Sequence, residues 1–296
     1  MMSVDRREFL KITGLGLSSF FMQPFQSKFS SVISDVSMGM LFDATVCIGC
    51  KKCQEACSEI RSGPATNRDE FDVAAPEKLS ADTWTLIKLY QDQEDKSSYA
   101  FIKAQCMHCV DPACVSACPL GALQKTEEGP VIYDPEICFG CRYCMAACPF
   151  GIPKYEWDKV LPLVQKCDFC ADRQKEGLLP ACAEACRIGA LTYGKRSELL
   201  VEARSRIKNN PDKYVDHIYG EHEVGGTSML YISHVPFEKL GLPTLDTKAL
   251  PELTEPWMTG LPGVVLGVGG LMSGIYWISN RRSEKQENDQ NGITKK

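Results

Sequence analysis

The feature that most constrains this chain is a cysteine motif that occurs four times. Cys47-x2-Cys50-x2-Cys53-x3-Cys57 recurs with the same spacing at Cys138, Cys141, Cys144 and Cys148. Two variants of the motif consist of Cys106, Cys109, Cys114 and Cys118, and of Cys167, Cys170, Cys182 and Cys186. The four groups account for all 16 cysteines of the 296-residue chain. The repeat therefore predicts a fold assembled from copies of one structural half-unit.

The spacing within each group predicts iron–sulfur chemistry. Three cysteines in a C-x2-C-x2-C run bring three thiolates onto one tight loop, which suits three corners of a 4Fe–4S cube. The cysteine three residues further on points away from that loop and ligates a neighbouring cluster. Soft thiolates favour iron–sulfur clusters, zinc or cuprous ions over hard cations. Sixteen such cysteines are the number that four cubes require.

Disulfide bonds and structural zinc are the alternatives for these cysteines. A disulfide framework does not need four local quartets, and cysteines separated by two residues rarely bridge each other. Structural zinc sites use C-x2-C pairs with longer spacers, which only the group at 167–186 resembles. A covalent c-type haem would need C-x-x-C-H, a sequence that does not occur. We expect His108 to be a structural imidazole near a cluster, because four thiolates already saturate it.

The net charge of the chain and the full ligation of its clusters exclude several classes of function. The formal net charge of −5 disfavours nucleic acid as a partner, because nucleic-acid binding needs a basic face. The sequence contains no evident nucleophile–base arrangement or open metal site. Fully ligated clusters leave no vacant iron for a substrate. We therefore expect a non-catalytic subunit that transfers single electrons through a relay of clusters.

Residues 1–30 have the pattern of an export signal. Arg6 and Arg7 precede Phe-Leu-Lys at 9–11, and a mostly uncharged stretch follows at 12–22. That stretch is too short and too rich in Gly and Ser to span a bilayer. Paired arginines before a weak apolar region are typical of a twin-arginine signal. An ordinary N-terminal helix with two basic residues is the alternative.

An uncharged segment at 257–280 predicts a transmembrane helix. A helix of this length would extend roughly 36 Å, enough to cross a hydrocarbon core of about 30 Å. Arg281 and Arg282 follow it, which places a tail at 281–296 in the cytoplasm and the preceding chain in the periplasm. We expect a linker at 241–256. A buried helix of a soluble domain is the alternative, although the glycines and Pro262 disfavour it.

Shorter patterns predict secondary structure around the cysteines. Two β-like runs at 82–90 and 98–104, joined by a polar stretch, predict a hairpin. Residues 31–46 have no strong pattern. The remaining expectations are strands at 131–133, 190–193 and 226–233, and a helix at 197–208.

Several motifs of the cysteine block resemble those of a known family. They are Cys-Ile-Gly-Cys at 47–50, Cys-Met-His-Cys at 106–109, Cys-Pro at 118–119 and 148–149, and Lys-Cys-Asp-Phe-Cys at 166–170. Through them, residues 40–240 resemble the ferredoxin-like electron-transfer subunits of membrane oxidoreductases, such as the β subunits of formate dehydrogenase and dimethyl sulfoxide reductase. The resemblance implies an α+β fold, a double ferredoxin-like domain holding four 4Fe–4S clusters. Ser58 and Arg187 depart from simple ferredoxins, which have Pro after the last cysteine.

The resemblance also implies how the cysteines share clusters. In that family the first group pairs with the fourth, and the second with the third. The implied ligand sets here are Cys47, Cys50, Cys53 and Cys186; Cys57, Cys167, Cys170 and Cys182; Cys106, Cys109, Cys114 and Cys148; and Cys118, Cys138, Cys141 and Cys144.

Within the family, an export signal together with a C-terminal anchor resembles the iron–sulfur subunits of hydrogenase 2 type. This implies electron flow from the small and large subunits of a periplasmic nickel–iron hydrogenase to a multi-pass, quinone-reducing membrane subunit. It also implies a single-pass protein of the inner membrane with most of its chain in the periplasm. The alternatives are a relay serving a molybdopterin enzyme such as formate dehydrogenase or polysulfide reductase, a disulfide- or zinc-stabilised tethered protein, and an independent reductase.

Overall fold

The computed structural model describes residues 37–61, 78–93, 96 and 98–293. The expected export signal at 1–30 lies outside these residues. The described chain divides into two units, the cysteine-bearing unit up to Leu253 and a second unit that begins at Thr254.

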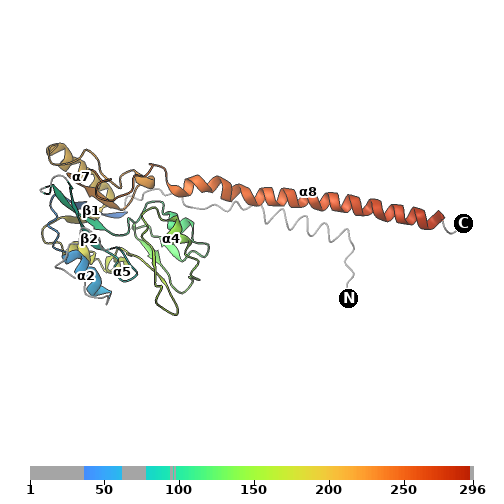
Figure 1. The fold of residues 1–296 in the computed structure, drawn as a ribbon, viewed down its shortest axis with the longest axis horizontal. Coiled ribbons are helices and arrows are strands. Elements are labelled where there is room, and N and C mark those ends of the chain that lie inside the picture. Colours follow the sequence, from blue (N-terminus) through green and yellow to red (C-terminus); the bar gives the residue numbers. More distant parts are fainter. Residues whose placement is uncertain (1–36, 62–77, 94–95, 97, 294–296) are drawn as a thin grey trace. The chain divides into compact units, whose positions relative to one another are not determined.

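A three-stranded sheet forms the centre of the cysteine-bearing unit (Figure 1). Its middle strand β1 (Met38–Asp43) pairs antiparallel with β8 (Leu191–Lys195) and parallel with β9 (Met229–Ile232). The sheet therefore joins the chain that precedes the first cysteine to the chain that follows the last one. The expected strands at 190–193 and 226–233 correspond to β8 and β9, whereas β1 lies in the stretch for which the sequence predicts nothing.

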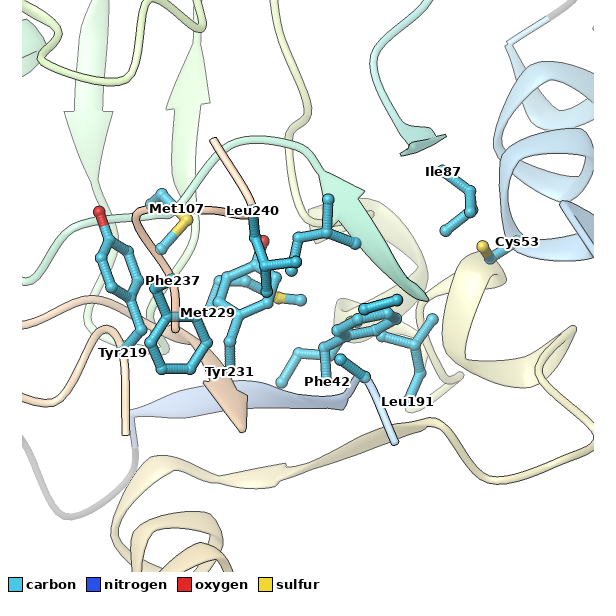
Figure 2. Close-up of a cluster of buried hydrophobic side chains, with 14 of the residues drawn as sticks. Phe42, Cys53, Ile87, Met107, Leu191, Tyr219, Met229, Tyr231, Phe237 and Leu240 are labelled. Carbon is cyan, nitrogen blue, oxygen red and sulfur yellow. The ribbon is translucent and has the colours of Figure 1, made fainter. Parts of the chain in front are cut away.

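Both faces of this sheet are buried, because alternate residues of a strand point to opposite sides. On one face Leu41 and Leu230 pack with side chains of α7 (Arg196–Asn209), the helix expected at 197–208. On the other face Phe42 and Tyr231 meet edge-on, with ring centroids 5.7 Å apart. Figure 2 shows this second core, which extends to Cys53 and so reaches a predicted cluster ligand.

The other strands form three small sheets. These are the antiparallel pairs β2 (Leu86–Gln91) with β3 (Tyr99–Ala104), β4 (Leu123–Lys125) with β5 (Val131–Tyr133), and β6 (Lys154–Tyr155) with β7 (Val164–Gln165). The predicted hairpin and the predicted strand at 131–133 are confirmed as β2–β3 and β5. The combination of strands with short helices confirms a mixed α and β fold.

Five of the sixteen cysteines lie on the short helices α2 (Lys52–Ile60), α3 (Ala113–Ser116), α4 (Tyr143–Ala147) and α6 (Ala181–Glu184). The unit also contains the short helix α5 (Ala171–Lys175) and, further along the chain, a 3-10 turn η1 (Glu223–Gly225). Helix α2 packs against α6, and α3 packs against α4. The first cysteine group is thus adjacent to the fourth, and the second to the third.

In the described residues, the second unit consists of most of one long helix. Helix α8 (Leu250–Ile293) contains Pro256 and Pro262, and within its segment Leu250–Glu284 an 18-residue stretch has a mean hydropathy of 1.6. By length and composition this segment could cross a membrane, and it includes the range 257–280 expected to do so. The helix begins within the expected linker at 241–256, and the preceding Phe237 and Leu240 are buried in the core shown in Figure 2.

Candidate iron–sulfur site

Each cysteine group begins with the same tight turn. The residue directly before the second cysteine has a positive φ in all four groups: Gly49 (69°), His108 (47°), Gly140 (78°) and Phe169 (62°). Glycine adopts this conformation readily, whereas a residue with a side chain does so at a steric cost. The shared turn confirms that the four groups are copies of one half-unit.

The third cysteine of each group lies on a short helix and is buried. Cys53, Cys114, Cys144 and Cys182 lie on α2, α3, α4 and α6 and are only 8–9 % exposed. The turn and the helix together aim several thiols of a group at the same interior point.

Three of the implied ligand sets line cavities. Cys47, Cys50, Cys53 and Cys186, which we call site A, line one cavity. Site B, which consists of Cys57, Cys167, Cys170 and Cys182, lines a second. Site D, which consists of Cys118, Cys138, Cys141 and Cys144, lines a third. In each case the fourth cysteine comes from the partner group that the resemblance implies.

The remaining set, site C, is recognised from its electrostatics. It consists of Cys106, Cys109, Cys114 and Cys148. Burial raises the pKa of Cys109 well above its usual range, and the charges of Cys106, Cys148 and Cys114 raise it further. Cys106, Cys148 and Cys114 therefore lie near Cys109, as a shared cluster would require.

The arrangement of the thiols suits a cluster better than a disulfide or a single ion. All sixteen cysteines lie in the described part of the chain, and each is a free thiol. Within the described residues, no group of three or more His, Cys, Asp or Glu side chains converges closely enough to hold one metal ion. Four thiols spaced around a cavity fit a cube that carries one iron at each ligated corner.

Burial favours the protonated form of Cys47, Cys53 and Cys114 when no iron is present. It raises the pKa of Cys53 and of Cys114 to about 12, and that of Cys47 to about 11. Because a metal ligand must be the thiolate, iron has to supply the positive charge that stabilises the deprotonated form in these cavities.

Backbone amides point at several of the sulfurs. The N–H of Ala122 donates to Cys118 Sγ at 3.2 Å, and the N–H of Phe169 donates to Cys167 Sγ at 3.4 Å. Backbone N–H groups of Phe150, Gly151 and Ile152 also lower the pKa of Cys148, whose burial raises it. Such hydrogen bonds favour electron-rich sulfur and so raise the potential of a bound cluster.

His108 has the structural role expected of it. Its ring is fully buried, and its Nδ1 accepts a hydrogen bond from the N–H of Val131 at 2.9 Å. Burial, and then the charges of Lys166, Lys125 and Lys103, lower its pKa well below the usual range, so the ring is neutral. The proton is therefore on Nε2, which has no hydrogen-bond partner among the described residues. A buried donor of this kind fits a sulfide-rich group nearby.

Sequence reasoning did not identify the buried lysines around the sites. Lys103 is 0 % exposed and Lys166 is 4 % exposed. Lys166 donates to the carbonyl oxygens of Val131 and Cys167, and Lys125 donates to those of His108 and Gly129. A lysine on a short strand gives no sequence signal of burial, because that residue type is almost always exposed. These cations fit clusters whose net charge is negative.

Comparisons with known proteins agree with this arrangement. Residues 97–196 match the family described as 4Fe-4S dicluster domain. The hydrogenase-2 operon protein HybA of Escherichia coli O157:H7 is 40 % identical over 287 residues, which cover 86 % of this chain and 87 % of HybA. A protein of Nitratidesulfovibrio vulgaris is 40 % identical over 297 residues, which cover 97 % of this chain and 80 % of that protein.

The likeness extends to another group of oxidoreductase subunits. The formate dehydrogenase-O iron-sulfur subunit of Escherichia coli K12 is 39 % identical over 201 residues, which cover 66 % of each chain. The bound cofactor is accordingly of the 4Fe–4S type. The chain belongs to the family of iron–sulfur electron-transfer subunits that includes HybA and the iron–sulfur subunits of formate dehydrogenases.

Proposed function

We propose that this chain is the electron-transfer subunit of a membrane-bound respiratory oxidoreductase that faces the periplasm, and that it holds four 4Fe–4S clusters. The observation that carries the proposal is the grouping of the cysteines, since sites A, B and D each place four thiols around one cavity. We assign Cys47, Cys50, Cys53 and Cys186 to one cluster, and the cysteines of sites B, C and D to the other three.

The protein supplies ligation, shielding and spacing. A bound 4Fe–4S cluster takes up and releases one electron at a time. The thiolates of each site fix the cluster, and the amide donors and buried cations around the sulfurs set its potential. Cys106 of site C and Cys167 of site B lie in the same buried side-chain cluster, together with Ile152. This contact supports a path for electrons between the two halves of the domain.

We infer that a nickel–iron hydrogenase, with small and large subunits, supplies the electrons and that a multi-pass membrane subunit passes them to quinone. The similarity to HybA covers 86 % of this chain, whereas that to the formate dehydrogenase-O subunit covers 66 %. This wider coverage favours the hydrogenase type. A molybdopterin enzyme such as formate dehydrogenase or polysulfide reductase remains the second candidate, supported by 39 % identity over 201 residues.

We also propose the domain organisation and location that the sequence predicts. Residues 1–30 form the export signal, 40–240 the cluster domain, 241–256 a linker, 257–280 the transmembrane helix and 281–296 a cytoplasmic tail. The apolar segment Leu250–Glu284 supports the anchor. Twin-arginine export of the folded domain into the periplasm suits clusters that are inserted in the cytoplasm.

Anaerobic purification of the native complex tests the proposal. Four cubes predict about 16 irons and about as many acid-labile sulfides per chain. Zinc, disulfides or the absence of metal would refute the clusters. Mass spectrometry of the co-purified subunits identifies the partner, and a molybdopterin subunit without a hydrogenase would exclude the hydrogenase assignment. Turnover of hydrogen or quinone by the isolated chain would contradict a pure relay.

A further inference from the structure

The β2–β3 hairpin places a fully buried lysine next to residues that line two of the cysteine-lined cavities. Lys103 on β3 pairs across the hairpin with Ile87, which lines the cavity of site A. The Nζ of Lys103 donates hydrogen bonds to Thr85 Oγ1 and Gln105 Oε1, and both of these residues line the cavity of site B. Figure 2 shows Ile87 beside Cys53, a cysteine of site A. Lys103 therefore lies behind the walls of both sites.

The charge of Lys103 has no carboxylate partner in the described part of the chain. Its two hydrogen-bond acceptors are neutral oxygens, and none of the ion pairs formed among the described residues includes it. A buried ammonium without an anion nearby is strongly unfavourable. The interior around Lys103 therefore has to contain negative charge from another source.

The thiolates of sites A and B are that source. Burial lowers the pKa of Lys103, but the charges of Cys182, Cys53, Cys167 and Cys57 oppose this effect, and the net shift is upward. Three of these cysteines belong to site B and one to site A. The strongest electrostatic partners of Lys103 among the cysteines are thus in these two sites.

We propose that Lys103 is the fixed counter-charge shared by the clusters of sites A and B, and that it raises the reduction potentials of these two clusters. The proposal rests on the proposed function, since it requires clusters in both sites. With four thiolates, such a cluster carries about −2 when oxidised and about −3 after it accepts one electron, by formal counting. A nearby fixed cation stabilises the more negative state more strongly, and no proton has to move.

Potentiometric titration of the full-length protein in its complex, followed by electron paramagnetic resonance, tests this. Lys103→Met keeps an unbranched side chain and removes the charge. We expect the reduced-to-oxidised ratio of two clusters to fall about tenfold at a fixed potential, a downward shift of about 59 mV for a one-electron couple. The matched control is Lys88→Met on strand β2, where the partly exposed lysine pairs with Ile102, and it should shift none of the four potentials.

A second variant provides an answer if Lys103→Met does not fold. Gln105→Glu has almost the same shape, keeps the acceptor for Lys103 Nζ and adds a negative charge beside it. It should lower the potentials of the clusters in sites A and B in the same way. The proposal is overturned if a fully loaded Lys103→Met or Gln105→Glu protein leaves these potentials unchanged, or if Lys88→Met shifts them equally. Iron and sulfide analysis of the wild-type protein separates this result from failure of the proposed function, in which no clusters would be found.

Discussion

The ring of His108 stacks on the ring of Phe169, with centroids 4.6 Å apart and planes inclined by 29°. The two residues occupy the same position of the turn in the second and fourth cysteine groups, where the other two groups have glycine. The stack therefore joins the loop of site C to the loop of site B. The favourable contact between the two rings offsets part of the steric cost of holding His108 and Phe169 in a left-handed backbone conformation.

Removing this stack should destabilise the domain. His108→Ala deletes the ring contact and leaves the buried N–H of Val131 without an acceptor, at a cost of about 3 kcal/mol. For a domain of about 200 residues, that cost lowers the midpoint of thermal unfolding by about 7 °C. Differential scanning calorimetry under anaerobic conditions measures it. The control is His222→Ala, because the side chain of His222 is 73 % exposed. Equal midpoints for the two variants would rule out a structural role for the stack.

The ligand sets predict which cysteines share a cluster. Cys186→Ser and Cys50→Ser should alter the same electron paramagnetic resonance signal, because both cysteines line the cavity of site A. Cys182→Ser should instead alter the signal that Cys57→Ser alters, because these two line the cavity of site B. This comparison distinguishes crossed ligation from ligation within one sequence group, because Cys182 and Cys186 belong to the same sequence group. A common effect of Cys182→Ser and Cys186→Ser on one cluster alone would contradict the crossed assignment.

Loss of the clusters should unfold the domain. Apart from the three-stranded sheet, the described strands form only two-stranded sheets, which have marginal stability by themselves in water. Metal binding is then a large part of the folding free energy. Oxidation with ferricyanide in the presence of a chelator should abolish the far-ultraviolet circular dichroism of the cluster domain and expose it to protease. Retention of a protease-resistant core after complete loss of iron would show that the polypeptide folds without its clusters.

A buried arginine ties the start of α7 to the chain around β9. Arg196 donates from Nε to the carbonyl of Thr227 at 2.7 Å, and from Nη2 to the carbonyls of Gly220 and Glu221 at 3.1 Å. Arg196→Met leaves these acceptors unpaired and should cost about 3 kcal/mol. Arg204 lies on the same helix and forms an exposed ion pair with Glu221. Arg204→Met removes this ion pair and should cost less than about 1 kcal/mol. Thermal unfolding of the two variants side by side tests the difference.

The proposed membrane topology and export route can be tested at the two ends of the chain. A reporter fused after Lys296 should be active in the cytoplasm, and one fused directly before Trp257 should be active in the periplasm. Replacement of Arg6 and Arg7 by lysines should retain the protein in the cytoplasm, because a twin-arginine signal depends on that pair. Export that persists without the arginines, while a conservative Lys11→Arg control behaves like wild type, would exclude this route.

The cysteine spacing predicted the repeated turns of the four groups because a cluster imposes local geometry on its ligands. The turns, the buried third cysteines and the β2–β3 hairpin all follow from short-range patterns. Strand β1 did not, although it is the middle of the main sheet. Met40, Leu41 and Phe42 are all almost fully buried, so the strand has no alternation of polar and apolar residues.

The sequence also did not predict which side chains surround the sites. Lys103 follows Ile102 in a half-buried hairpin, where a lysine would ordinarily face water. Its burial depends on how residues from distant parts of the chain pack around the sites. The contact between His108 and Phe169 likewise depends on how the second and fourth groups pack, and neither residue signals it locally.

Helix α2 packs against α6, while α3 packs against α4, so the contacts are nested along the chain. During synthesis, all cysteines of sites C and D are present once Cys148 has left the ribosome. At that point site A still lacks Cys186, site B lacks Cys167, Cys170 and Cys182, and β1 has neither of its neighbouring strands. The clusters of sites C and D can therefore be inserted into a nascent chain. Those of sites A and B can be completed only when almost the whole domain has been translated.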